Sequence, residues 1–143
     1  MHTEYDLHIA VVEYIRNNYP QVVIIAGLGE NQTTVSRRIK SYKKGYTKGQ
    51  PDLILHSDNK YYSSLCIELK TPTGKGVLSK QQKEVLDRLE DCGCKCVVSN
   101  NFNEITQTID DYMFEERICC CKCQQDFITY EGLNYHLTYF HKI

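Results

Sequence analysis

The apolar residues of this 143-residue chain fall in runs that are all short. The longest run has five residues, 22–26, which suits a β-strand and is far below the ~20 residues of a membrane-crossing helix. Strand-like and helix-like segments alternate along the chain: helix 4–18, strands 22–26, 52–56 and 65–70, helix 79–92, strand 94–99 and helix 103–117. This order predicts an α/β fold in which helices cover a sheet.

The segment 27–49, between the first two strands, is predicted to be a polar and basic loop. It opens with Gly27-Leu-Gly29, but the third glycine of a dinucleotide-binding turn is absent, which argues against that class of enzyme. The composition, 41% hydrophobic and 24% charged, suffices for a buried core.

The length allows one ordinary domain and a small module, and we place their boundary between 1–115 and 116–143. The first six residues carry neither a basic leader nor an apolar segment, so we expect a protein of the cell interior, in nucleus or cytoplasm. Thiols are reduced there, and clustered cysteines then favour a metal site. The four cysteines outside the 119–123 cluster are interpreted as small buried hydrophobes: Cys66, Cys92, Cys94 and Cys96.

The net charge is −1, yet ten of the seventeen basic residues lie in two windows that contain no acid, 37–48 and 70–83. A polyanion bound there would release counterions, so the windows predict nucleic-acid binding. The alternative is two solvated loops. The candidate nucleic-acid-binding residues are Arg37, Arg38, Lys40, Lys43, Lys44, Lys48, Lys75 and Lys80; Lys70 and Lys83 complete the second window.

Asp52, Glu68 and Lys70 form the candidate centre. Glu68 and Lys70 are two apart on one predicted strand and share a face, and Asp52 falls opposite Glu68 if the two strands are antiparallel. Two converging carboxylates suit Mg²⁺, with Lys70 beside them to orient or stabilise an attacking water. The alternative is a cross-strand salt bridge of Lys70 with one of the acids.

Each of two helices carries one polar residue on its apolar face. Glu4 lies on the stripe of Leu7 and Val11, and an acid there suggests a third metal ligand, unless the helix end simply exposes it. Gln82 lies on the stripe of the second helix, but Ser79-x-x-Gln82 is also a capping box, which would explain the glutamine without chemistry.

The stretches Gly49-Gln-Pro-Asp-Leu-Ile-Leu55, Cys66-Ile-Glu-Leu-Lys70 and Leu78-Ser-Lys-Gln-Gln-Lys-Glu84 resemble the virus-type replication-repair nuclease (VRR-NUC) domain, a branch of the PD-(D/E)xK nuclease superfamily. The likeness covers roughly residues 3–100. It implies a restriction-endonuclease-like core (αβββαβ, a mixed sheet flanked by helices) and Mg²⁺- or Mn²⁺-dependent phosphodiester hydrolysis. By position it implies these roles: Asp52 and Glu68 as metal ligands, Lys70 as the catalytic lysine, Glu4 as the first-helix acid and Gln82 as the second-helix glutamine. The family commonly has Gln where His8 stands.

The C-terminal segment has the spacing of a Cys2His2 zinc finger, Cys120-x2-Cys123, twelve residues, then His136-x4-His141. Cys119 is an alternative first ligand. Zn²⁺ would supply most of the folding free energy of so short a ββα unit. Residues 118–143 carry two acids and two lysines, so the partner of this segment is left open between DNA and a protein.

These features together predict a Mg²⁺-dependent nuclease for branched or structured DNA, in replication, repair or recombination, with a C-terminal zinc finger. The rival hypothesis is a catalytically inactive adaptor that binds nucleic acid or protein. The resemblance is compatible with a homodimer and with a virus-encoded protein. We expect no membrane partner, and the residues do not distinguish DNA from RNA.

Overall fold

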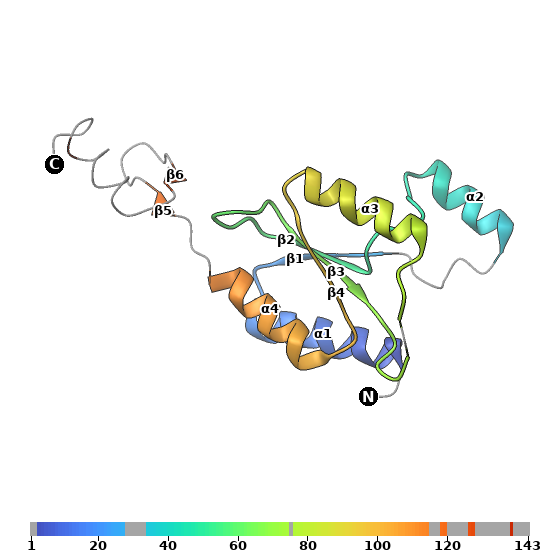
Figure 1. Cartoon of the computed structure of the whole chain (residues 1–143), viewed down its shortest axis with the longest axis horizontal. Helices are drawn as coiled ribbons and strands as arrows, with labels where there is room; N and C mark the ends of the chain where they lie inside the picture. Colours follow the sequence, from blue (N-terminus) through green and yellow to red (C-terminus); the bar gives the residue numbers. More distant parts are fainter. Residues whose placement is uncertain are drawn as a thin grey trace.

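The computed structural model describes residues 3–27, 34–74 and 76–114, together with 118–119, 126–127 and 138. Figure 1 shows the elements in chain order: α1 (Glu4–Asn18), β1 (Val23–Ala26), α2 (Val35–Lys43), β2 (Leu53–His56), β3 (Leu65–Leu69), α3 (Lys80–Asp91), β4 (Lys95–Ser99), α4 (Phe102–Phe114), β5 (Ile118–Cys119) and β6 (Asp126–Phe127). No helix in the described ranges combines the length and the apolar character needed to span a bilayer.

The first four strands form one sheet in the order β1-β2-β3-β4. The pairs β1–β2 and β2–β3 are antiparallel and β3–β4 is parallel, so the expected mixed α/β sheet is confirmed. Leu53 pairs with Ile67. Asp52, which directly precedes Leu53, is thereby carried to a position across from Glu68.

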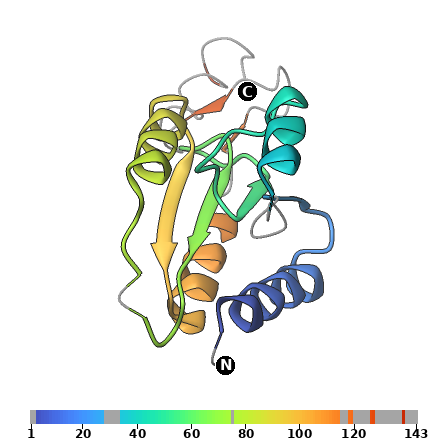
Figure 2. The same cartoon turned by 90° about the vertical axis from the view of Figure 1, so that its right-hand side faces the viewer.

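Helices cover both faces of the sheet (Figures 1 and 2): α1 and α4 lie against one face and α3 against the other. All five residues of β3 are buried, as expected for a central strand. The alternation of side chains sends Leu65, Ile67 and Leu69 into the core with α1 and α4. Cys66 and Glu68 therefore face the side of α3.

Local signals mark the starts of α1 and α3, and the capping box predicted at Ser79 is confirmed. Thr3 caps α1 and forms a capping box with Asp6, and Ser79 forms the same motif with Gln82 at the start of α3. Beyond the end of α3, Gly93 has a positive φ of 85°, which a glycine adopts without strain.

A half-buried carboxylate, that of Asp110, joins α1 to α4. The hydroxyl of Tyr14 donates to both oxygens of Asp110 at 2.7 and 2.8 Å, and that of Tyr19 donates to Oδ1 at 2.7 Å. The pKa of Tyr19 is raised, mainly because it is removed from solvent, and the pKa of Tyr14 is raised mainly by its hydrogen bond to Asp110. Both phenols therefore stay protonated and can donate to the carboxylate.

The prediction that 27–49 is a loop is wrong, because the segment contains the helix α2. Thr34 caps this helix by accepting a hydrogen bond from the Arg37 backbone. None of the nine α2 residues is buried, so local capping rather than core packing marks its start.

The prediction that four cysteines are buried is correct for Cys66 alone. Cys94 and Cys96 are half-buried, and Cys92 is exposed at the end of α3. The three least exposed thiols lie where β3 and β4 run side by side, since Cys66 pairs with Cys96 in the sheet.

The predicted C-terminal module lies largely outside the described residues. Within it, β5 and β6 pair antiparallel, with Ile118 opposite Phe127 and Cys119 opposite Asp126. The four predicted zinc ligands lie outside the described residues: Cys120, Cys123, His136 and His141. The zinc finger and the boundary at 115/116 remain predictions.

Candidate active site

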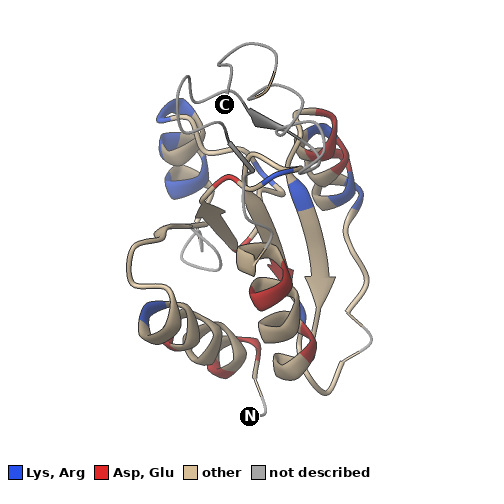
Figure 3. Cartoon of the chain, turned by 90° about the vertical axis from the view of Figure 1, so that its left-hand side faces the viewer, with Lys and Arg blue, Asp and Glu red and all other residues tan. Residues whose placement is uncertain are grey.

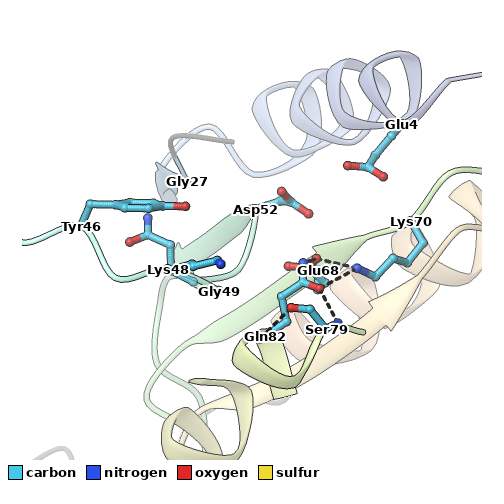
Figure 4. Close-up of a pocket in the computed structure, with 11 residues that line it drawn as sticks. Glu4, Gly27, Tyr46, Lys48, Gly49, Asp52, Glu68, Lys70, Ser79 and Gln82 are labelled. Carbon is cyan, nitrogen blue, oxygen red and sulfur yellow. Dashed lines mark hydrogen bonds and ion pairs between the residues drawn. The ribbon is translucent and has the colours of Figure 1, made fainter. Parts of the chain in front are cut away.

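One cavity of about 370 Å³ brings together residues from α1, β3, α3 and the two connections of α2 (Figure 4). It contains all five residues predicted to be catalytic. The lining residues are Glu4, Gly27, Tyr46, Lys48, Gly49, Gln50, Asp52, Glu68, Lys70, Ser79 and Gln82. Apart from Pro51, every residue of the predicted motif Gly49-Gln-Pro-Asp lines this cavity.

Asp52 is held by the backbone of the neighbouring strand. The Leu69 N–H donates to its Oδ2 at 2.8 Å. Burial raises the pKa of the Asp52 carboxyl, while the Leu69 hydrogen bond and the charges of His8 and Lys70 act in the opposite sense. His8, the residue that departs from the family pattern, therefore lies near enough to influence Asp52.

Glu68 is only 3% exposed, and Oε1 accepts hydrogen bonds from two side chains. The Lys70 Nζ donates at 2.9 Å, and the Gln82 Nε2 donates to the same oxygen. Burial is the main cause that raises the pKa of Glu68 to about 6; the Asp52 and Glu4 charges add to the rise and Lys70 opposes it. Asp52 and Glu68 are thus close enough to repel each other.

Lys70 is bound on two sides, since its Nζ also donates to the Gln82 Oε1 at 3.2 Å. The salt-bridge alternative is correct to this extent: the ion pair of Lys70 exists, with Glu68 as its partner. The pair lies inside the cavity rather than on an exposed face of the sheet, with side-chain exposures of 12% and 4%.

Gln82 forms the predicted capping box and also contacts two residues of the cavity. Its Oε1 accepts from the Ser79 backbone N–H at 2.9 Å, which completes the capping box of α3. The same amide contacts Lys70 and Glu68. The cap holds the glutamine on the first turn of α3, and so the amide is positioned at the cavity.

Glu4 is the first residue of α1 and points toward Asp52 from that helix (Figure 4). Its Oε2 accepts a hydrogen bond from the Thr71 hydroxyl at 3.4 Å. The alternative that a frayed helix end exposes this acid is not what the structure shows, because Glu4 is half-buried and lines the cavity.

The loop 44–50 supplies Tyr46, a cavity residue that was not predicted from the sequence, beside Lys48, Gly49 and Gln50, which were part of a predicted window or motif. Gly49 has a φ of +89°, and a Cβ there would lie 2.6 Å from the Gln81 carbonyl, so only glycine lets this loop approach α3 so closely. Tyr46 lines the same cavity as the carboxylates, and its pKa is raised first by burial and then by the charges of Asp52 and Glu68. The turn-rich Gly45-Tyr46 and Gly49-Gln50 pattern was the available signal, but it carries no charge or periodicity.

The candidate nucleic-acid-binding residues divide by position. Of the candidates within the described residues, Lys48 lines the cavity. Lys80 is exposed at the start of α3, 3.8 Å from Glu84. Lys75 lies outside the described residues. The others are exposed on α2 or at its end: Arg37, Arg38, Lys40, Lys43 and Lys44.

Asp52 and Glu68 form a pair of acids rather than a complete set of metal ligands. Among the described residues, no three His, Cys, Asp or Glu side chains gather closely enough to hold a metal ion. In that same part of the chain, Asp52 Oδ1 and Glu68 Oε2 accept no hydrogen bond, so each carboxylate keeps one oxygen for a ligand. This donor set fits Mg²⁺, which is commonly bound by one or two carboxylates with water and phosphate as its other ligands.

A mixed sheet covered by helices, with an Asp and a Glu-x-Lys strand at one cavity, defines a nuclease-type α/β domain. The VRR-NUC domain model matches residues 7–102, about two thirds of the chain, and the chain belongs to this family. The matched range includes Asp52, Glu68, Lys70 and Gln82 and begins after Glu4. Membership of a nuclease family indicates a nuclease-type hydrolytic function and binding to nucleic acid.

A solved structure described as a VRR_NUC domain protein has a similar fold, with a TM-score of 0.65. It is 22% identical to this chain, and the match covers 80% of this chain and 90% of that one. A search among curated proteins gives no significant match.

Proposed function

We propose that this chain is a divalent-metal-dependent nuclease that hydrolyses phosphodiester bonds in branched or otherwise structured DNA. The observation that carries the proposal is the cavity itself: Asp52 and Glu68 meet there, with the Lys70 ammonium bonded to Glu68 and Gln82. Buried carboxylates that repel each other are costly unless a cation offsets their charge.

Asp52 and Glu68 would hold Mg²⁺ or Mn²⁺, with Glu4 as the third candidate ligand. The metal would neutralise charge on the phosphate and lower the pKa of a bound water. The free oxygens of the two carboxylates and the family pattern support this assignment.

The side chains around the acids have separate tasks. Lys70 presents its ammonium beside Glu68 and so can orient the attacking water or stabilise negative charge. Gln82 holds Lys70 in place through its Oε1. Lys48, on the other side of the cavity, offers a positive charge to the phosphate backbone.

The C-terminal segment is proposed to fold around Zn²⁺ through Cys120, Cys123, His136 and His141. Its sequence spacing supports this, and Zn²⁺ content by mass spectrometry of the native protein would test it. The proposal predicts one bound Zn²⁺ per chain in the wild type and loss of that Zn²⁺ in the His136→Ala variant.

The decisive experiment is a cleavage panel over single-stranded, duplex, flap and four-way DNA with Mg²⁺ or with EDTA. The wild type should cut flap or four-way DNA with Mg²⁺ alone, and Lys70→Ala should lower the rate by roughly 100- to 10,000-fold. Lys83→Ala is the matched control, because that lysine is exposed on α3 and pairs with Asp87 away from the cavity. Salt-sensitive DNA binding without any metal-dependent cleavage would support the inactive adaptor instead.

A further inference from the structure

The helix α2 exposes a stripe of large apolar side chains. Val35, Ile39 and Tyr42 are 63%, 51% and 75% exposed, and their spacing places them on one face of the helix. None of the nine residues of α2 is buried. Three large apolar side chains on a helix that contributes nothing to the core suggest a surface that meets a partner.

Basic residues lie on both sides of this apolar stripe. At the helical repeat, Arg38 falls beside the stripe on one side and Lys43 on the other, and Figure 3 shows the basic colour along α2. The window 37–48 holds six basic residues and no acid. Such a surface attracts a polyanion. When the basic residues hold the phosphates, the apolar stripe between them faces the groups of the polyanion that lie between the phosphates.

Both connections of α2 lead into the candidate active site. Gly27, before the helix, and Tyr46 and Lys48, after it, line the cavity (Figure 4). A nucleic-acid strand that follows the basic residues of α2 and then Lys48 is therefore led to the cavity that holds Asp52 and Glu68. This continuity favours the substrate over an unrelated protein as the occupant of the stripe.

A second copy of the chain is a poorer occupant of the stripe. Two α2 helices packed face to face would bring Arg38 and Lys43 of each copy toward those of the other. Like charges opposed across an interface disfavour association.

We propose that the stripe of Val35, Ile39 and Tyr42 contacts unpaired bases of a nucleic acid whose phosphates α2 holds, and thereby selects branched or single-stranded regions over continuous duplex. This inference rests on the proposed function, because it identifies the substrate feature that the cavity receives. In a duplex the base faces are stacked on one another, so they are not accessible to the stripe. An unpaired base presents an apolar face, on which Tyr42 can stack and against which Ile39 can pack.

The test uses a double variant that carries both Ile39→Ser and Tyr42→Ser. The control is the single variant Lys40→Ser, because Lys40 lies on another face of α2. Fluorescence anisotropy in EDTA, at one fixed salt concentration, gives the Kd for a labelled duplex and for the same duplex carrying a single-stranded flap. The double variant should weaken flap binding by about tenfold and leave duplex binding within about twofold. Lys40→Ser should weaken both by the same factor, since it removes a phosphate contact.

An equal loss on both DNAs, or no loss on either, would overturn the inference. So would a wild-type dimer that the double variant converts to a monomer in light scattering while DNA binding is unchanged. Cleavage assays with Mg²⁺ on the same proteins separate the two proposals. If the double variant cleaves flap DNA at the wild-type rate and binds it with the wild-type Kd, only this inference is contradicted. If flap binding depends on the stripe but the wild type cleaves no DNA, only the proposed nuclease activity is contradicted.

Discussion

The candidate active site and the helix α2 use side chains in opposite ways. Glu68 is 3% exposed and accepts hydrogen bonds from Lys70 and Gln82, whereas Tyr42 on α2 is 75% exposed. The cavity draws its residues from the central strand β3 and from two capped helices. On α2 none of the nine residues is buried.

The difference in burial between the cavity and α2 matches the different requirements of catalysis and of substrate binding. Catalysis requires groups held at fixed positions, and a buried sheet with capped helices provides that order. Binding to a flexible polyanion requires charge and accessible surface, and a helix can provide both without core packing. The following predictions test whether the two regions divide their tasks in this way.

The largest effect is expected from neutralising one of the two central carboxylates. Asp52→Asn should lower the cleavage rate by about a thousandfold or more, because a metal ligand is worth several kcal/mol of transition-state stabilisation. It should also abolish the rise in melting temperature that Mg²⁺ produces in the wild type. The metal-free variant should be no less stable than wild type, since burial disfavours the Asp52 charge.

The control for this change is Asp87→Asn, which removes an exposed acid of α3. Steady-state cleavage and thermal unfolding with and without Mg²⁺ provide the measurements. Wild-type activity in Asp52→Asn would show that the cavity is not the chemical centre, and the contrast with α2 would disappear.

A smaller loss is expected when Lys70 is displaced rather than removed. A Cβ on Gly76 would lie 2.5 Å from the Lys70 Cβ and 2.7 Å from its Cγ, so Gly76→Ala must shift the stem of the lysine. Misplacement of a catalytic group by about 1 Å can cost about 100-fold in rate. We expect a loss of up to this size in kcat, with DNA binding and melting temperature close to wild type.

Val77→Ala serves as the control next to Gly76, because Val77 is 83% exposed. Single-turnover kinetics with saturating enzyme separates the chemical step from binding. A Gly76→Ala protein that binds DNA poorly but reacts at the normal rate would contradict a positioning role for the Lys70 stem.

The pH dependence of stability should report the buried acid directly. The pKa of Glu68 is raised to about 6 by burial, so its protonated form is favoured in the folded state. Its contribution to the stability of the metal-free protein is fully present below pH 4.5 and is lost as the pH rises through about 6. The loss should be about 1–2 kcal/mol, the lower value allowing for solvent screening.

Urea unfolding in EDTA between pH 4 and 8 measures this loss. Glu68→Gln should flatten the profile over this interval, and Mg²⁺ should restore stability above pH 6 in the wild type alone. A pH profile unchanged by Glu68→Gln would mean that another group causes the decline.

The smallest effect is expected on α2, where single charges act in water. The pair of changes Lys40→Ala and Lys43→Ala should weaken DNA binding by a similar factor for all DNA forms. It should also lower the slope of log K against log salt by about two, one for each phosphate contact. Anisotropy titrations from 50 to 300 mM salt measure the slope, and an unchanged slope would place the DNA elsewhere on the protein.

Much of the fold follows from signals that are local in the chain. The start of α3 follows from the Ser79 capping box predicted from the sequence, and Thr3 forms the same motif at the start of α1, because a capping box satisfies backbone groups within one turn. The shared face of Glu68 and Lys70 was predicted from the two-residue period of a strand. The two residues do lie together in one cavity.

Signals that conflict locally gave the wrong answers. The helix α2 was expected to be a loop because of its charge density and the glycines around it, although Thr34 and the apolar spacing were present. Cys92 was expected to be buried, yet its place at the end of α3 exposes it. A cysteine among apolar neighbours can face either side, and only packing decides which.

The sequence by itself determined which chemical groups are available: two acids, a lysine on the strand of the second, and a glutamine at a helix start. It also determined their faces, since strand and helix periods are properties of the local backbone. Only the tertiary structure decided that Tyr46 and Lys48 join them, that Glu4 lines the same cavity rather than being exposed at a helix end, and that both connections of α2 contribute to it. Those meetings depend on sheet register and on the close approach at Gly49, and such long-range contacts are set by how the whole core packs rather than by neighbours in the chain.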